Sequence, residues 1–180
     1  VDEYHRTSIP GLWAAGECAC QYHGANRLGG NSMLAAIYGG RVAAQNAAIT
    51  LCDGPAEPKP IGRMKDTLCK ERAVSPAFAN TLADILKNGL GILRDQKTMD
   101  DAVNKLNTLM SGDLSRAEYQ RAMLGKAMLL SADARRESRG AHTRTDFPDR
   151  DDSAFQKTTV ARLENGCVQI RFCDIPSGRR

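Results

Sequence analysis

The apolar and polar positions of the first 54 residues predict a strand, a polar loop and a helix. Residues 12–15 form a short apolar run bounded by glycines, which is typical of a buried strand in a parallel sheet. A polar loop follows and ends in Gly29-Gly30, after which small residues recur at spacings of three and four. This spacing predicts a helix over 33–51, with Asn31 or Ser32 as the N-cap.

Between residues 75 and 135, apolar positions recur at helical spacing in three successive stretches. The first stretch begins at Ser75-Pro76, where a serine N-cap precedes a proline in the first turn. The second is expected to begin at Thr98 and the third at Ser115, each followed three residues later by a carboxylate. Three capped amphipathic helices predict a small helical bundle.

The C-terminal residues combine a charged loop with a hairpin signal. Asn165-Gly166 stands between apolar stretches, and residues 168–172 alternate between apolar and polar, which predicts a terminal β-hairpin. The preceding loop alternates in charge: His142, Arg144, Asp146, Asp149, Arg150, Asp151 and Asp152. Such a loop can hold itself together by ion pairs, or it can be presented to another domain.

A change of composition near residue 54 divides the predicted elements into domains. Residues 52–60 are rich in proline and glycine, and they separate small residues from long amphipathic ones. We therefore expect one domain over 1–54, a linker over 55–62, a helical bundle domain over 63–145, and a loop with a hairpin over 146–180. Residues 61–73 form a possible short helix. The expected fold is mainly α with a little β.

Composition excludes several classes of function. No segment approaches 18 uninterrupted apolar residues, so no membrane insertion is expected. The net charge of +4 is modest and is not gathered into a polybasic tract with aromatics, which argues against a nucleic-acid partner. The six cysteines form no Cys-x-x-Cys pair, so neither a zinc site nor a disulfide framework is indicated, and we expect reduced thiols.

The loop between the predicted strand and helix is the candidate ligand site. A helix N-terminus offers unpaired N–H groups and a positive dipole end, and two glycines let a flat or anionic ligand approach the backbone. Glu17, His23 and Arg27 lie in the same loop. The guanidinium of Arg27 suits a substrate carboxylate, because it can donate two parallel hydrogen bonds. The alternative, that Arg27 braces the loop by binding carbonyls, fits the spacing equally well.

Two long motifs resemble one known family. Residues 9–17 read Ile-Pro-Gly-Leu-Trp-Ala-Ala-Gly-Glu, and residues 22–32 read Tyr-His-Gly-Ala-Asn-Arg-Leu-Gly-Gly-Asn-Ser. Residues 136–142 read Arg-Glu-Ser-Arg-Gly-Ala-His, and the second motif continues to Thr159. In this order they closely resemble the flavoprotein subunit of succinate dehydrogenase and fumarate reductase. L-aspartate oxidase is similar around Asn-Arg-Leu-Gly, whereas Arg150-Asp151-Asp152 favours the dehydrogenase and reductase branch.

The resemblance implies a fold and an activity. The chain would hold the last strand, loop and helix of a Rossmann-like FAD-binding domain, then a three-helix bundle and a C-terminal loop with a hairpin. The activity implied is interconversion of succinate and fumarate by hydride transfer to or from FAD, with electrons passed to an iron–sulfur partner. An L-aspartate oxidase-type flavoenzyme is one alternative. A catalytically inert structural module is another.

The resemblance also implies roles for individual residues. Arg27 would bind a carboxylate of the dicarboxylate substrate, while His23 would brace the loop. Glu17, Asn31, Ser32 and Met33 would hold the flavin. The segment from His142 onwards would fold back towards the flavin domain.

The family's Gly-x-Gly-x-x-Gly fingerprint does not occur in this sequence. The chain therefore resembles a C-terminal fragment, and we expect the isolated chain to be inactive. By the same resemblance, the whole protein would be cytoplasmic, or held at the inner face of the cytoplasmic membrane through partner subunits.

Overall fold

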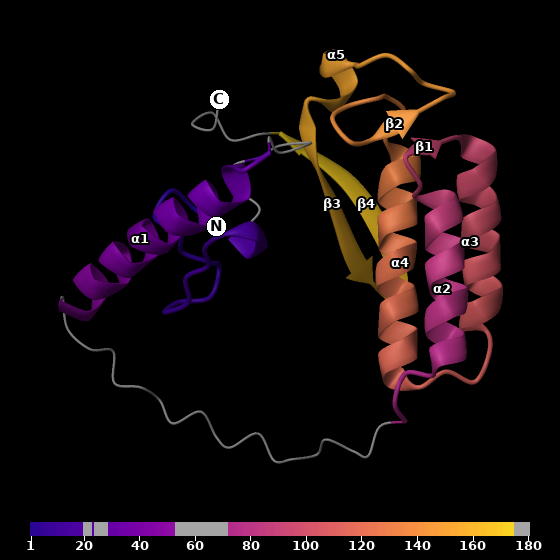
Figure 1. Cartoon of the computed structure of the whole chain (residues 1–180), viewed down its shortest axis with the longest axis horizontal. Coiled ribbons are helices and arrows are strands. Elements are labelled where there is room, and N and C mark those ends of the chain that lie inside the picture. The colour runs from indigo at the N-terminus through magenta and orange to yellow at the C-terminus, as the bar shows by residue number, and fades with distance from the viewer. Residues whose placement is uncertain (20–22, 24–28, 53–71, 175–180) are drawn as a thin grey trace. The chain divides into compact units, whose positions relative to one another are not determined.

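The computed structural model describes residues 1–19, 23, 29–52 and 72–174, and it is mainly helical with a small amount of β structure (Figure 1). The chain divides into two compact units, Val1–Thr67 and Leu68–Arg180. The predicted linker over 55–62 and most of the possible short helix over 61–73 lie outside the described residues. The predicted domain boundaries therefore stay predictions.

The predicted buried strand over residues 12–15 is wrong. In its place Trp13 forms an isolated antiparallel bridge with Arg6, and Leu12 is 49% exposed. The backbone of residues 12 and 14 forms hydrogen bonds within the N-terminal segment. The Thr7 N–H donates to Leu12 O at 2.9 Å, and the Ala14 N–H donates to His5 O at 3.0 Å. A strand needs a neighbouring strand to pair with, and the described part of this unit contains no other strand.

The long helix of the first unit is α1, Asn31–Cys52, which follows the short 3₁₀ helix η1, Glu17–Ala19. It begins at Asn31, so Asn31 and Ser32 lie in its first turn and are not its N-cap as predicted. Gly30 precedes the helix with φ +81°, a backbone conformation that glycine adopts without strain. This conformation lets the helix begin at Asn31, ahead of the predicted start at residue 33.

Small residues on α1 allow the N-terminal segment to lie directly against the helix. A Cβ added at Gly39 would lie 2.7 Å from Cε1 of the fully buried His5. A Cβ added at Gly16 would lie 3.5 Å from the Cβ of Ala36. The small-residue face of α1 therefore packs against the segment that carries His5 and Gly16.

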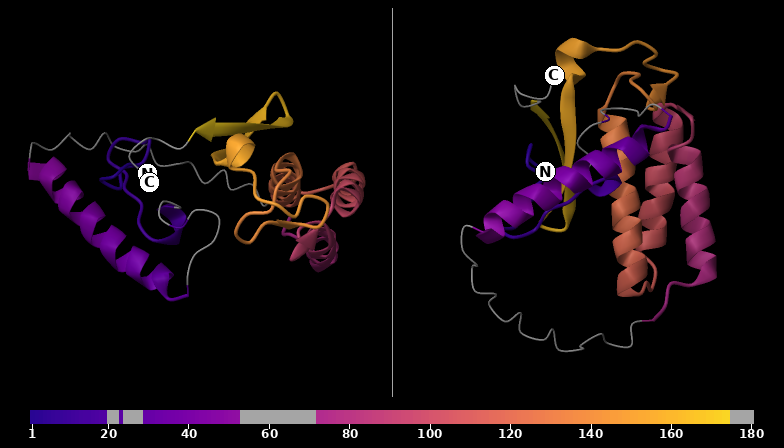
Figure 2. Two further views of the ribbon diagram at one scale, coloured as in Figure 1. Left: turned by 90° about the horizontal axis from the view of Figure 1, so that it is seen from above. Right: turned by 60° about the vertical axis from the view of Figure 1, so that its left-hand side comes forward.

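The second unit is built on three helices that pack side by side in Figures 1 and 2. They are α2, Pro76–Gly89, α3, Gln96–Met110, and α4, Arg116–Ala134. Their shared core contains Phe78, Leu82, Ile85, Ala102, Leu106, Ala122 and Leu129. A Cβ at Gly89 would lie 2.5 Å from the Cβ of Ala102, so the packing of α2 against α3 leaves no room for a side chain at this position.

Side-chain caps define where the three helices begin. Ser75 caps α2 and Ser115 caps α4 in a capping box with Glu118, so both predicted caps are confirmed. The predicted cap at Thr98 is wrong, because α3 begins three residues earlier with Asp95 as its cap. The backbone N–H of Thr98 donates to Asp95 Oδ1 at 2.9 Å, and Thr98 is therefore the third residue of the helix.

Strand β1, Leu93–Arg94, pairs in parallel with β2, Thr143–Arg144, and the short helix α5, Asp152–Phe155, follows. Strands β3, Lys157–Glu164, and β4, Cys167–Asp174, form an antiparallel pair that contacts α4. Their turn has positive φ at both Asn165 and Gly166, +51° and +76°. Those values match the two-residue turn that Asn-Gly favours.

Candidate functional site

The glycine-rich entry to α1 has an open backbone. No atom of a described residue lies within 4 Å of where a Cβ would stand at Gly29 or at Gly30. The first turn of α1 contains no acidic residue, and the N–H groups of Asn31 and Ser32 make no hydrogen bond to any described residue. This helix end can therefore receive a flat or anionic ligand on its N–H groups.

A pocket of about 320 Å³ opens beside this helix end, lined by His23, Asn31, Leu34, Ala35 and Tyr38. Met33 is 70% exposed, and Leu34 and Tyr38 are also mostly exposed. The polar groups at the helix start thus adjoin an apolar surface, a combination typical of sites for aromatic ligands.

Glu17 is brought to the same unit by η1, which packs against α1. The approach is close because Gly16, with φ +77°, allows the chain to turn beside Ala36. His5 fixes the preceding segment, since its Nδ1 donates to Ala14 O at 2.7 Å. Glu17 itself is exposed, so its carboxylate can accept hydrogen bonds from a ligand.

The described part of the loop does not include Arg27, which lies in the segment 24–28 outside the described residues. Its predicted substrate role is therefore untested by the structure. The structure does place His23 and Asn31 at one pocket. The indole N–H of Trp13 is buried without a partner among the described residues, so an acceptor is needed beside it.

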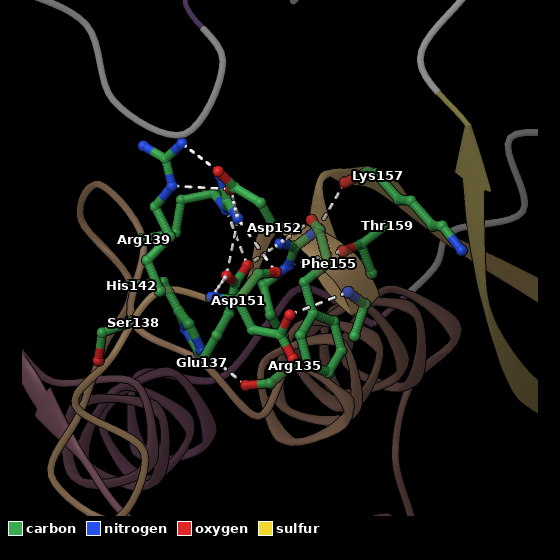
Figure 3. A network of polar contacts seen from close by, with 12 residues as sticks. Arg135, Glu137, Ser138, Arg139, His142, Asp151, Asp152, Phe155, Lys157 and Thr159 are labelled. Carbon is green, nitrogen blue, oxygen red and sulfur yellow. Dashed lines mark hydrogen bonds and ion pairs between the residues drawn. The ribbon is translucent and has the colours of Figure 1, made fainter.

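The second unit carries a charged network centred on Glu137, shown in Figure 3. Glu137 is fully buried and accepts hydrogen bonds from Arg135, from Arg139 at 2.8 Å and from the Asp151 N–H at 3.0 Å. Burial would raise the pKa of Glu137, but these hydrogen bonds outweigh it and lower that pKa below its usual value. The network therefore holds a negative charge inside the unit.

Asp152 and Arg150 extend this network to the surface. Asp152 accepts a hydrogen bond from Arg139 at 2.7 Å and binds Arg150, so hydrogen bonds from these two guanidiniums hold the pKa of Asp152 well below its usual range. Arg135 continues the network to the hairpin through Thr159 Oγ1 and Lys157 O, and it lies over the rings of Phe155 and Phe172. The loop of alternating charge thus contains an internal ion-pair network.

A fully buried cation, Arg144, fixes the start of the charged loop. Its guanidinium donates two hydrogen bonds to Asp146, at 2.7 and 2.6 Å, and another to Gln96 Oε1 at 3.3 Å. Hydrogen bonds from Arg144 lower the pKa of Asp146 to about 2 although burial opposes the shift. Sequence reasoning missed the central roles of Glu137 and Arg144, because nothing local distinguishes them from the charged residues around them.

The described residues of the two units meet the requirements of neither a metal centre nor a membrane-spanning helix. In the described ranges, no three His, Cys, Asp or Glu side chains gather as a metal site. The helices resolved among those same residues are too short or too polar to cross a bilayer.

Comparison with known proteins gives matches to both units. Residues 118–177 match the fumarate reductase flavoprotein C-terminal family, and residues 1–33 match an FAD-binding domain. The chain is 39% identical over 165 residues to an L-aspartate oxidase of Rhodospirillum rubrum, covering 89% of the chain and 57% of that relative. It is 32% identical over 193 residues to the succinate dehydrogenase flavoprotein subunit of Bacillus subtilis, covering 90% of the chain and 33% of that relative.

A solved structure agrees with these matches. A quinol–fumarate reductase with menaquinol molecules superposes with a TM-score of 0.75 at 29% identity, over 97% of this chain and 36% of the solved one. The chain thus spans 57% of the first relative and about a third of the other two proteins.

Proposed function

Because this chain belongs to the succinate dehydrogenase and fumarate reductase flavoprotein family, we propose that the whole protein interconverts succinate and fumarate with FAD as its cofactor. The observation that carries this proposal is the pair of family matches, an FAD-binding domain over 1–33 and the reductase C-terminus over 118–177, in one chain. The open glycine pair at the start of α1 supports it.

The residues at the α1 entry fit FAD. The N–H groups of Asn31 and Ser32 would bind polar atoms of the cofactor, and the exposed Met33 side chain would contact its flat ring system. The Glu17 carboxylate would accept hydrogen bonds from cofactor hydroxyls. When bound, FAD supplies the acceptor or donor for the hydride that leaves or joins the substrate carbon.

The substrate would be held by Arg27. Its guanidinium would donate two parallel hydrogen bonds to one carboxylate of succinate or fumarate, which fixes the plane of that carboxylate. His23 would brace the loop that carries Arg27. Support for this assignment comes from the sequence motif around Arg27, since that residue lies outside the described part of the loop.

We further propose that the electrons pass from FAD to an iron–sulfur subunit. One solved relative is a quinol–fumarate reductase with menaquinol, which supports an electron route beyond the flavoprotein. Partner subunits of this kind would place the whole protein at the inner face of the cytoplasmic membrane.

L-aspartate oxidase activity is the second candidate function. It is favoured by the 39% identity to the Rhodospirillum rubrum enzyme, which exceeds the 32% identity to the Bacillus subtilis subunit. Both candidates act on a four-carbon dicarboxylate, so the proposed role of Arg27 is the same in each.

Steady-state assays of the purified whole protein separate the candidates. We expect visible flavin absorbance, succinate oxidation with an artificial electron acceptor, and fumarate reduction with a reduced dye. Oxidation of aspartate, with no turnover of succinate or fumarate, would replace the first proposal by the second. A protein without flavin after expression in flavin-rich medium would overturn both.

A further inference from the structure

An open groove lies on the second unit beside α4. It measures about 480 Å³, and its lining includes Leu90, Arg94, Leu124, Met128, His142 and Ala161. Helix α4 supplies one wall, and strands β1 and β3 contribute Arg94 and Ala161. Leu124 is 64% exposed and Met128 is 49% exposed, so the groove presents apolar side chains to water.

Arg94 is a cation in this groove without an acidic partner among the described residues. Its Nε donates to Gly91 O at 3.0 Å, its Nη1 to His142 Nδ1 at 2.8 Å, and its Nη2 to Leu90 O at 3.5 Å. A guanidinium has five N–H donors, so one donor on each terminal nitrogen stays uncommitted. Partial burial lowers the pKa of Arg94, in keeping with a cation that no nearby carboxylate compensates.

His142 leaves the charge of Arg94 uncompensated. Because a guanidinium only donates, His142 Nδ1 must accept, and the proton then sits on Nε2 and is donated to Arg135 O at 3.0 Å. The imidazole is therefore neutral in this arrangement. Burial lowers the pKa of His142, and the nearby charges of Arg94, Arg144 and Arg135 lower it further.

The other cation of the groove is already engaged. Arg135 binds Glu137 and also donates to Thr159 Oγ1, Phe155 O and Lys157 O. The unmatched positive charge of the groove is therefore located at Arg94, which lines it together with apolar side chains of α4 and of the hairpin.

We propose that this groove docks a segment of a partner protein in which a carboxylate side chain stands between apolar side chains. The carboxylate would pair with the two uncommitted donors of Arg94, and the apolar neighbours would cover Leu124 and Met128. A small free acid would leave those two side chains largely in water, whereas a protein segment covers them. Arginine and methionine are also enriched at the centres of protein interfaces. This inference does not depend on the proposed activity.

Methyl NMR of the full chain tests the docking directly. The protein is labelled with ¹³C-methyl methionine, the Met128 signal is assigned with Met128→Leu, and acetyl-Leu-Glu-Leu-amide is titrated in. We expect the Met128 signal to shift while that of the fully buried Met99 does not. The matched peptide with Gln in place of Glu should bind at least about tenfold more weakly, since it cannot form charge-assisted hydrogen bonds.

Three variants check that Arg94 and the apolar wall act together. Arg94→Gln should weaken binding of the Glu peptide to the level of the Gln peptide. Leu124→Glu places a repelling charge at an exposed position and should have a similar effect without disturbing the core. Arg121→Gln removes one charge from an exposed position of α4 that is not part of the groove lining, and should leave binding unchanged.

Several outcomes overturn the proposal. Equal binding of the Glu and Gln peptides would remove the role of Arg94. Unchanged peptide binding by Leu124→Glu would show that the apolar wall does not contribute to docking. If Arg94→Gln fails to fold, Leu124→Glu remains as the variant that tests the proposal. If sodium acetate shifts the Met128 signal as strongly as the peptide does, the groove binds a free anion and is not a docking site.

Discussion

A single buried carboxylate, Glu137, joins its two neighbouring arginines to the segment that precedes α5. It binds Arg135 at the end of α4, Arg139 in the following loop, and the backbone of Asp151 before α5. A buried carboxylate is tolerated only when its hydrogen-bonding capacity is filled, and Glu137 meets that condition with two cations and one N–H. At the scale of the residue, its charge is what orders the loop.

Glu137→Gln should therefore destabilise the second unit strongly. The substitution keeps the shape but leaves Arg135 and Arg139 without their buried anion, so we expect the free energy of unfolding to fall by about 3 kcal/mol. Urea unfolding followed by circular dichroism measures the loss. Glu164→Gln is the matched control, because Glu164 pairs with the exposed Arg171, and a surface pair contributes less than about 1 kcal/mol. Equal losses in the two variants would contradict the central role of Glu137.

The proposed substrate role of Arg27 is tested in the whole protein by Arg27→Lys. Lysine keeps the charge but loses the two-donor fork, and loss of a buried charged hydrogen bond costs roughly 2–5 kcal/mol. We expect kcat/KM for succinate to fall by at least about 30-fold, while the bound flavin content stays near normal. A variant that loses flavin but keeps normal activity per remaining flavin would show that Arg27 braces the cofactor.

At the scale of the element, one carboxylate caps two helices. Glu118 Oε2 accepts from the Ser115 N–H at 2.9 Å, which completes the capping box of its own helix α4. Glu118 Oε1 accepts from the N–H of Ser75 at 2.9 Å and from its hydroxyl at 3.0 Å. Because Ser75 caps α2, the starts of α2 and α4 are joined through one side chain.

This shared cap predicts an order of effects. Ser115→Ala removes one cap and should lower the free energy of unfolding by about 1 kcal/mol. Glu118→Gln should cost more than Ser115→Ala, because its amide NH2 replaces one of the two accepting oxygens and faces an N–H group at the start of α2 or α4, while the remaining oxygen loses its charge. Urea unfolding of the three proteins side by side gives the order. A loss for Glu118→Gln no larger than that for Ser115→Ala would mean that the link to Ser75 contributes nothing.

Elements that rest on a local signal were predictable from sequence, and those that rest on distant contacts were not. The caps at Ser75 and Ser115 follow from short patterns. The cap at Asp95 was missed because Thr98, three residues on, carries an equally good pattern. The parallel strands β1 and β2 have two residues each and lie about 50 positions apart in the sequence, so no local pattern predicts their pairing.

In the candidate site, too, the features that rest on a local motif were predictable and those that rest on distant contacts were not. The glycines before α1 and the exposed carboxylate of Glu17 follow from the motif of the loop, and the structure shows the open backbone at Gly29 and Gly30. The contact of His5 with Gly39 was not predicted, since it depends on how the N-terminal segment lies across α1. The proposed roles of Arg27 and Met33 rest on family resemblance.

At the scale of the whole chain, the second unit is held together by carboxylates whose pKa values are lowered on folding. Hydrogen bonds from the Ser75 and Ser115 N–H groups lower the pKa of Glu118 to about 2, and hydrogen bonds from Arg144 lower that of Asp146 to about 2. The pKa values of Glu137 and Asp152 are also lowered. Glu118 lies in the first turn of α4, Glu137 and Asp146 lie in the loop that follows this helix, and Asp152 is the first residue of α5.

Such shifts give a defined dependence of stability on pH. A group with a lowered pKa in the folded state binds fewer protons there than in the unfolded state at intermediate pH, so folding stability falls as the pH falls. The stabilisation is fully present above the unfolded-state pKa values, which are 3.8 for aspartate and 4.5 for glutamate, and is lost towards pH 2.

We therefore expect the urea midpoint of the second unit to stay nearly constant from pH 7 to about pH 5.5 with respect to these carboxylates, and to fall steeply between about pH 4.5 and pH 2.5. Circular dichroism at the helical band measures it, because this unit holds α2, α3 and α4. Asp146→Asn should lower the midpoint at pH 7 and flatten the fall, since one titrating group is removed while Arg144 loses its nearest anionic partner. A midpoint that does not change between pH 4.5 and pH 3, or an equally steep fall in Asp146→Asn, would contradict this account of how the charged loop stabilises the unit.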